Sequence, residues 1–214
     1  MRLPDPFTDS NAPGFLSVSI SDNSTIIQDE LPNNEVLQVD TGYQYWGIDI
    51  TYDKLLPEEY EIIRSFCFKA KATNSTIEVI LPQFENYKFQ LNTYTVKAGL
   101  SGSSIVIPNV TTITGQPIVG TVVKLSTHPK VYHVTGYSYN STTKDYTLSV
   151  YPKLAITTTG AETVALSAVQ FTTRFKDVNS ITAVLNSDNV YEGFTLQLRE
   201  ALKWGVSLLQ QKTI

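Results

Sequence analysis

The middle of this 214-residue chain, from 94 to 154, most constrains the possible folds, because it is a compact run of short strands and turns. Five short β-branched or aromatic segments follow one another, at 94–98, 104–107, 122–125, 131–134 and 146–150. Glycine, proline and asparagine fall between them and supply the turns. Five strands at this spacing predict a small closed barrel of the OB type.

The segments on both sides of this block predict a second domain, which the block interrupts. Strand patterns occur at 15–20, 43–52 and 76–81, and again at 163–166, 169–175 and 193–199. In the clearest of them, apolar residues alternate on one face: Trp46, Ile48, Ile50 and Tyr52. We therefore predict a mainly β protein in which residues 1–87 and 167–214 form one discontinuous domain and residues 88–166 form the inserted barrel. The two junctions must then lie close together.

One α-helix is predicted, over residues 57–70. Pro57 suits the first turn, and Glu58 and Glu59 complement the positive end of the helix dipole. One apolar stripe follows helical spacing: Leu56, Tyr60, Ile63, Cys67 and Ala70. The helix is therefore expected to bury this stripe against the strands of the outer domain.

The two ends of the chain give weaker patterns. Three prolines in the first 14 residues predict an extended segment, which a neighbouring subunit could order. The last 13 residues, from Leu202, fit a short helix or a frayed end, with Trp204, Leu208 and Leu209 able to dock. There is no signal peptide and no run of about 20 apolar residues, so we expect a soluble product made in the cytoplasm.

Few residues carry chemistry. With 16 Lys and Arg against 20 Asp and Glu, the charge balance argues against a nucleic-acid binder. Cys67 is the one cysteine, and its place on the apolar stripe predicts a small buried hydrophobe. His128 and His133 have no further ligands at metal spacing, and we interpret them as a turn residue and a barrel-wall residue. Glu58 and Glu59 point about 100° apart and cannot work as an acid/base pair. We expect no enzymatic activity, no metal and no cofactor.

Tyrosine is the enriched side chain with functional potential, at 12 copies. Tyr132, Tyr137 and Tyr139 lie on or beside the fourth barrel strand, with Gly136 as a candidate bulge. Tyrosine rings can stack on sugars or anchor a protein interface. Ordinary barrel walls with polar tips are the favoured interpretation. The alternative is a carbohydrate-binding adhesion module that recognises host surface polysaccharide through the barrel.

Several motifs resemble the distal tail proteins of long-tailed siphophages, in the form found in tequintaviruses. They are 1–6 (MRLPDP), 29–33 (DELPN), 45–50 (YWGIDI), 57–60 (PEEY), 81–83 (LPQ), 125–132 (LSTHPKVY), 156–160 (ITTTG) and 196–202 (LQLREAL). The resemblance spans the chain up to Leu202, and residues 203–214 extend beyond the pattern of the family.

The resemblance implies a tail-tube-like β-sandwich with one helix and an outward-projecting OB-fold insertion. It implies a structural virion protein at the tail tip, assembled in the host cytoplasm, with no catalytic or cofactor-binding residues. The implied partners are five further copies in a hexameric ring, the tail tube protein and the baseplate hub protein, with a collar or fibre-attachment protein as a further candidate. Neither nucleic-acid binding nor membrane insertion is implied. Some relatives carry sugar-binding insertions, which is why the alternative function stays open.

Overall fold

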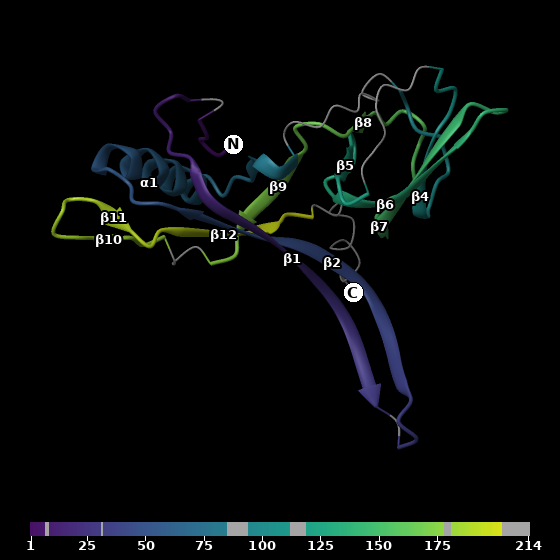
Figure 1. Ribbon diagram of the computed structural model, residues 1–214, viewed down its shortest axis with the longest axis horizontal. Coiled ribbons are helices and arrows are strands. Elements are labelled where there is room, and N and C mark those ends of the chain that lie inside the picture. The colour runs from purple at the N-terminus through teal and green to yellow at the C-terminus, as the bar shows by residue number, and fades with distance from the viewer. Residues whose placement is uncertain (7–8, 31, 85–93, 112–118, 178–180, 203–214) are drawn as a thin grey trace, which may run out of the picture. The chain divides into compact units, whose positions relative to one another are not determined.

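The computed structural model describes residues 1–6, 9–30, 32–84, 94–111, 119–177 and 181–202. The chain divides into two compact units, Met1–Glu78 with Thr173–Glu200, and Val79–Thr172 with Ala201–Ile214. Figure 1 shows antiparallel sheets and, in the described part of the chain, one α-helix. The prediction of a mainly β protein with one helix is therefore confirmed. No helix in these residues is long and apolar enough to cross a membrane.

The first sheet is built around β2. Its strand order is β1-β2-β12-β9-β3. The bounds are β1 (Phe15–Glu30), β2 (Val36–Tyr52), β12 (Thr195–Glu200), β9 (Gln170–Phe175) and β3 (Ile77–Ile80). β1 and β2 pair from Phe15↔Tyr52 to Glu30↔Val36, whereas β12 pairs with β2 only from Thr195↔Thr51 to Arg199↔Gly47. The sequence predicted strands at 15–20 and 43–52, and both are far longer in the structure.

The inner half of β2 supplies the core of the first unit. Its alternating apolar residues are at most 5% exposed: Trp46, Ile48, Ile50 and Tyr52. The predicted face is therefore confirmed. A fully buried aliphatic or aromatic side chain of this size contributes roughly 1.5–3 kcal/mol relative to an exposed one, so this strand stabilises the unit strongly.

The helix α1 (Pro57–Ala72) covers part of this core. Four members of the predicted stripe are buried: Tyr60, Ile63, Cys67 and Ala70. The fifth, Leu56, lies just before the helix and is 51% exposed, so its assignment to the stripe is wrong. Its backbone N–H instead donates to the Glu59 carboxylate at 2.9 Å, which caps the first turn. The Tyr60 ring meets Phe194 edge to face at 5.6 Å, and Phe194 in turn contacts Tyr52.

The first residues dock on their own unit. Leu3 N–H donates to Glu78 O at 2.8 Å, and Glu78 N–H donates to Met1 O at 2.7 Å, so the segment pairs in parallel with β3. Leu3 is 1% exposed. The expectation that a neighbouring subunit orders this segment is wrong for residues 1–5, because the free edge of β3 and the buried Leu3 already hold them.

The second unit contains an antiparallel sheet in the order β4-β7-β6-β5-β8. The bounds are β4 (Gly102–Ile107), β7 (Asp145–Leu154), β6 (Val131–Asn140), β5 (Val122–Leu125) and β8 (Val164–Ala165). Four of the five predicted barrel strands are thus confirmed. Their inward side chains form one apolar cluster that includes Ile105, Val123, Tyr132 and Leu148.

The fifth predicted barrel strand, 94–98, makes isolated backbone hydrogen bonds and no continuous β-ladder. Val96 N–H donates to Glu162 O at 3.0 Å, and Lys97 N–H donates to Val106 O at 2.8 Å. The segment thus bonds to β4 on one side and to the chain entering β8 on the other. Because these bonds form no continuous ladder, the described residues make an open sheet where the sequence predicted a closed barrel. Residues 85–93 and 112–118 lie outside the described part of this unit.

Smaller elements complete the two units. A hairpin of β10 (Val184–Leu185) and β11 (Tyr191–Glu192) and a 3-10 helix, Pro82–Phe84, were not predicted. The predicted turn after Asn140 is confirmed, because its Oδ1 accepts the N–H groups of Thr142 and Thr143. The predictions for Trp204, Leu208 and Leu209 lie outside the described residues.

The buried stripe of α1 gives a direct test of the first unit. We expect Ile63→Asp to lower its free energy of unfolding by about 3–5 kcal/mol, because an uncompensated carboxylate would replace a fully buried side chain. Chemical denaturation of the purified chain measures this. The matched control is Ser65→Asp on the exposed side of the same helix, for which a change within about 0.5 kcal/mol is expected. Equal effects of the two substitutions would contradict the packing described above.

Candidate functional site

Tyr132 does not belong to the predicted tyrosine surface. Its ring is fully buried, and its hydroxyl hydrogen-bonds to His128 Nδ1 at 3.1 Å and accepts Ala155 N–H at 3.1 Å. The sequence could not show this, because Tyr132 and Tyr139 occur on the same strand, whose inward direction changes at a bulge. That bulge, between Val134 and Gly136, confirms the prediction at Gly136.

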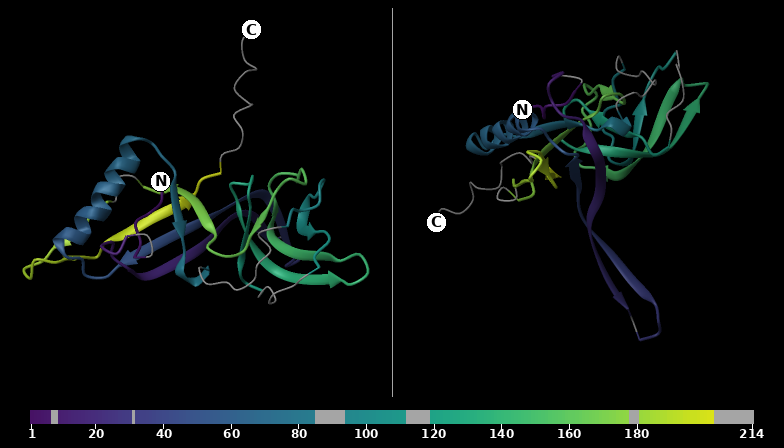
Figure 2. Two further views of the ribbon diagram at one scale, coloured as in Figure 1. Left: turned by 90° about the horizontal axis from the view of Figure 1, so that it is seen from above. Right: turned by 60° about the vertical axis from the view of Figure 1, so that its left-hand side comes forward.

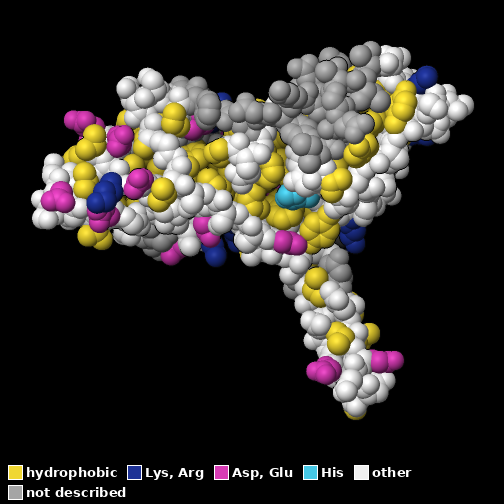
Figure 3. Space-filling view, viewed as in Figure 1, with side chains coloured by type: hydrophobic (Ala, Val, Ile, Leu, Met, Phe, Trp, Pro, Cys, Tyr) yellow, Lys and Arg dark blue, Asp and Glu magenta, His cyan; other side chains and the backbone are white. Residues whose placement is uncertain are grey.

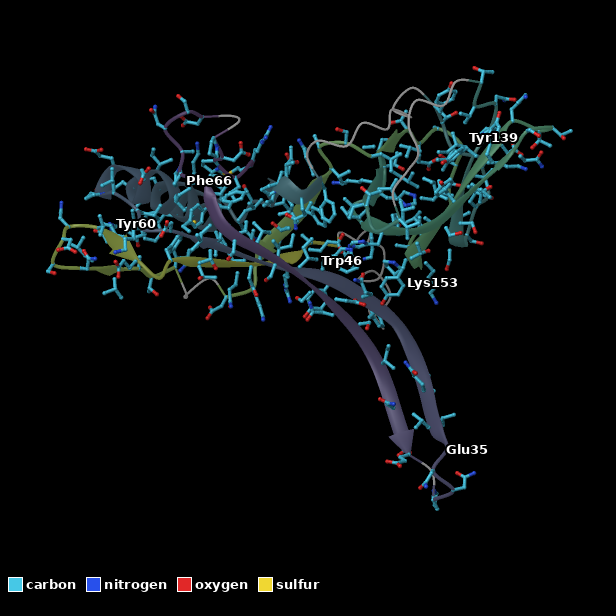
Figure 4. All side chains as sticks on the ribbon, in the orientation of Figure 1. Glu35, Trp46, Tyr60, Phe66, Tyr139 and Lys153 are labelled. Carbon is cyan, nitrogen blue, oxygen red and sulfur yellow. The ribbon has the colours of Figure 1, made fainter. Side chains whose placement is uncertain are left out.

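Tyr137 and Tyr139 do reach the surface of the second unit. They are 40% and 38% exposed and flank the buried Tyr146 of β7, with ring centroids 6.0 and 6.1 Å from it. The Tyr139 hydroxyl also donates to Val110 O at 3.2 Å (Figure 4 labels Tyr139). More than half of the surface of each tyrosine is covered by neighbouring residues, so neither ring is fully open to a ligand.

Glu162 is the most strongly hydrogen-bonded side chain of this unit. It is 1% exposed, and its carboxylate accepts the N–H groups of Thr159 and Gly160 and the hydroxyls of Thr159 and Thr127, at 2.9–3.3 Å. Burial acts to raise the pKa of this carboxyl, but the hydrogen bonds outweigh burial and lower the pKa to about 2. Glu162 is therefore a charged clamp between the 158–162 turn and the end of β5.

His128 lies beside this clamp and is 2% exposed. Its Nε2 is buried and has no hydrogen-bond partner in the described part of the chain. Burial lowers the pKa of the imidazole, and the nearby Glu162 carboxylate opposes part of that effect. The sequence identified His128 as a turn residue, which is confirmed, but it gave no sign of this burial.

The other candidate chemical groups are packing residues in the structure. His133 meets Phe84 edge to face at 6.0 Å. Cys67 is fully buried, and burial raises the pKa of its thiol to about 12, so the thiol is unreactive at neutral pH. Across the described residues, no three His, Cys, Asp or Glu side chains gather in a way that could hold a metal ion.

An open depression of about 850 Å³ lies at the start of α1. Its lining includes Glu58, Glu59 and Glu61 together with Ser10 and Asn11 of the N-terminal segment. Glu59 is already engaged in capping the helix. The described residues that line the depression include no His, Cys or Lys.

The feature that sequence reasoning missed is the outer part of the β1–β2 hairpin, residues 22–46, which we call the arm. Its five described aliphatic residues are 42–59% exposed: Ile26, Ile27, Val36, Leu37 and Val39. In the described part of the chain, β12 pairs with β2 only as far as Gly47, so no third strand accompanies the arm. Figures 1 and 2 show it extending away from the rest of its own sheet. The two apolar segments around the 32–34 turn were the available signal.

The base of the arm is fixed by two features of β2. The buried Glu200 carboxylate accepts Trp46 N–H at 3.3 Å, one residue beyond the last β12 pair (Figure 4 labels Trp46). At Gly47, an added Cβ would clash with Ser21 Oγ and would lie 2.8 Å from Asn23 Nδ2, so the side chains of β1 leave no room for a side chain there. The sheet therefore ends, and the arm begins, at a defined place.

The Glu162 clamp gives a second test. We expect Glu162→Gln to destabilise the second unit by about 1.5–3 kcal/mol, because an amide of the same shape loses the charge that its four donors stabilise. The stabilisation should be full above the ordinary glutamate pKa of 4.5 and disappear as the pH falls towards 2. Thermal unfolding of the variant measures this, with the exposed Glu61→Gln as the control. A Glu162→Gln variant as stable as that control at pH 7 would show that the clamp is not energetically significant.

His128 makes the stability of the second unit depend on pH near neutrality. Its folded-state pKa is lowered, so the unfolded chain binds the proton more readily and stability falls as the pH drops below the ordinary value of 6.5. We expect the loss of stability between pH 7.5 and pH 5 to be larger in the wild type than in His128→Gln, as measured by thermal unfolding. Parallel pH profiles for the two proteins would contradict the burial of a neutral imidazole.

Comparison with known proteins identifies the family. Two family models match the chain: "Distal tail protein pb9, A domain, N-terminal" over residues 3–84, and "Distal tail protein pb9, B domain" over residues 86–169. The chain is also 43% identical over 206 residues to distal tail protein pb9 of Escherichia phage T5, which covers 94% of this chain and 100% of that protein. The predicted resemblance to the tequintavirus form is confirmed. The chain belongs to the family of pb9-like distal tail proteins, the structural tail components of T5-like phage virions.

Proposed function

We propose that this protein forms a six-membered ring at the tail tip, where it joins the tail tube to the baseplate hub. The observation that carries the proposal is the 43% identity to a distal tail protein along that protein's whole length. A role in assembly also fits a chain whose chemically reactive groups, such as Cys67 and His128, are buried. Copies of the same chain, the tail tube protein and the hub protein are the proposed partners, with a collar or fibre-attachment protein on the outside.

Within each copy, we propose one discontinuous ring domain, 1–87 with 167–214, of the tail-tube-like sandwich type, and an inserted OB-type domain, 88–166. The B-domain match over 86–169 and the compact unit from Val79 to Thr172 support this division. β3 and β9, which flank the insertion in sequence, are neighbours in the first sheet, as an insertion requires. The single bonds from 94–98 to both sides of the second sheet support a barrel that is closed by a short, irregular segment.

A second candidate function rests on the exposed edges of Tyr137 and Tyr139. Two tyrosine rings on one face of a strand can stack on sugar rings, and OB-type domains bind oligosaccharides. This alternative would make the second unit an adhesion module for host surface polysaccharide. Tyr132 would take no part in it, because it is buried.

Cryo-electron microscopy of tails from the phage that encodes this chain tests the ring directly. We expect six copies in one closed layer at the junction between tube and hub. A single copy at a fibre end, or a layer of this chain that does not close, would contradict the proposal.

Titration of the purified chain with host lipopolysaccharide distinguishes the structural role from the adhesion role. The structural proposal predicts no saturable binding up to millimolar concentration. Binding that is lost in Tyr137→Ala and Tyr139→Ala, but kept in Tyr43→Ala, would favour the adhesion module, because Tyr43 is a still more exposed tyrosine, at 72%, of the other unit.

A further inference from the structure

The arm combines exposed apolar side chains with negative charge alone. Residues 15–53 contain seven acidic residues and no Lys, Arg or His: Asp22, Asp29, Glu30, Glu35, Asp40, Asp49 and Asp53. On the face in view, Figure 3 shows hydrophobic and acidic side chains along the arm and no basic one. Glu35 marks its tip in Figure 4. An acidic, apolar surface of this kind fits a basic, apolar partner.

One face of the arm is suited to contact. Ile27 lies opposite Val39, and Asp29 lies opposite Leu37, so these four residues share a face of the hairpin. Its three aliphatic members are each at least half exposed. A two-stranded hairpin is marginally stable in water on its own, and a third element packed on this face would stabilise it.

The first unit also carries a surface of the opposite character, on the C-terminal half of α1. Residues 62–77 contain Arg64, Lys69 and Lys71 and no Asp or Glu. Phe68 is 48% exposed there, with the Arg64 guanidinium 5.4 Å from its ring centroid. Beside the end of the helix, the Arg174 guanidinium donates to Asn74 Oδ1 at 2.9 Å and adds a further positive charge.

The arm and this helix surface do not meet within one copy. Both belong to the first unit, and in Figures 1 and 2 the tip of the arm and α1 lie at opposite ends of that unit. Two different and complementary surfaces on one chain are what a head-to-tail contact requires, and repeated head-to-tail contacts close into a ring when the rotation permits.

Building on the proposed ring, we propose that the arm of each copy packs across α1 of the next copy. Ile27, Leu37 and Val39 cover Phe68 in this contact. Asp29, on the same face, meets the positive charges of Arg64 and Lys69. The occupant of the arm's exposed face is therefore a second copy of this chain.

Cysteine cross-linking in assembled tails tests this contact. Val39→Cys puts a thiol of similar size to the valine on the contact face of the arm, Ser65→Cys puts one a turn from Phe68 on α1, and the native Cys67 is buried. In phage carrying both substitutions, a short bis-maleimide should link copies into multimers on a denaturing gel. When the two single variants are co-expressed, a dimer should form, and neither single variant alone should give one. Val39→Cys with Val184→Cys, a 72% exposed residue of the same unit, is the negative control.

Three other results would contradict the contact. A dimer from Val39→Cys alone would mean that arms meet arms, and a product with a different tail protein would mean that another partner covers the arm. Absence of the 39/65 product in tails that contain a ring of this chain would refute the contact while leaving the proposed function intact. Absence of the wild-type chain from the tails would refute the proposed function as well.

A charge exchange gives an independent readout. Reversing the charge of the contact face with Asp29→Lys should lower incorporation into tails at least tenfold. Reversing Arg64 and Lys69 to Glu in the same chain should restore most of it. Failure of Arg64→Glu with Lys69→Glu to rescue Asp29→Lys would contradict a direct contact between these groups.

Discussion

The antiparallel strand β2 is the element on which the first unit depends. Its inner half buries Trp46, Ile48 and Ile50 in the core and pairs with β1 on one side and β12 on the other. Its outer half continues for ten residues, 36–45, beyond the Trp46 bond to Glu200, and among the described residues no third strand pairs with it there. One strand therefore serves both as an interior strand of a stable sheet and as half of an exposed arm. The change occurs at Trp46 and Gly47.

A buried inner half and an exposed outer half of the same strand suit a structural protein that works as part of a larger assembly. The inner half of β2 and the stripe of α1 supply hydrophobic stabilisation within the copy, and the Glu162 clamp fixes the second unit by charged hydrogen bonds. The aliphatic residues of the arm add little hydrophobic stabilisation to the isolated chain, because they stay about half exposed. In the proposed contact another copy covers them, and the arm would then link the stability of the copy to the formation of the assembly.

The sequence predicted the elements whose pattern is local. The alternation of Trp46, Ile48, Ile50 and Tyr52, the stripe of α1 from Tyr60 to Ala70 and the turn after Asn140 follow from periodicity and turn chemistry, and these are confirmed. The family was also identified from sequence motifs. What the sequence could not supply depends on distant partners. The docking of Leu3 on β3 is one case, and the fifth segment of the second unit, which forms only single bonds, is another.

The candidate binding surfaces also depend on contacts that the sequence pattern does not reveal. Tyr132 and Tyr139 occur on one strand, and only the bulge before Gly136 and the packing on β7 separate a core tyrosine from a half-exposed one. The arm went unnoticed because its apolar residues resemble those of a buried hairpin. Exposure, which sequence periodicity does not report, identifies it as a surface.

Hydrogen-exchange mass spectrometry tests the central claim, that assembly covers the arm, most directly. The exchange of peptides from residues 22–46 is compared between the purified chain and the same chain in intact tails, with peptides from residues 57–72 and 47–52 as internal references. We predict that arm amides exchange rapidly in the free chain and become strongly protected in tails, while the peptide from 47–52 is protected in both. Equal exchange of the arm in the two states would contradict the account.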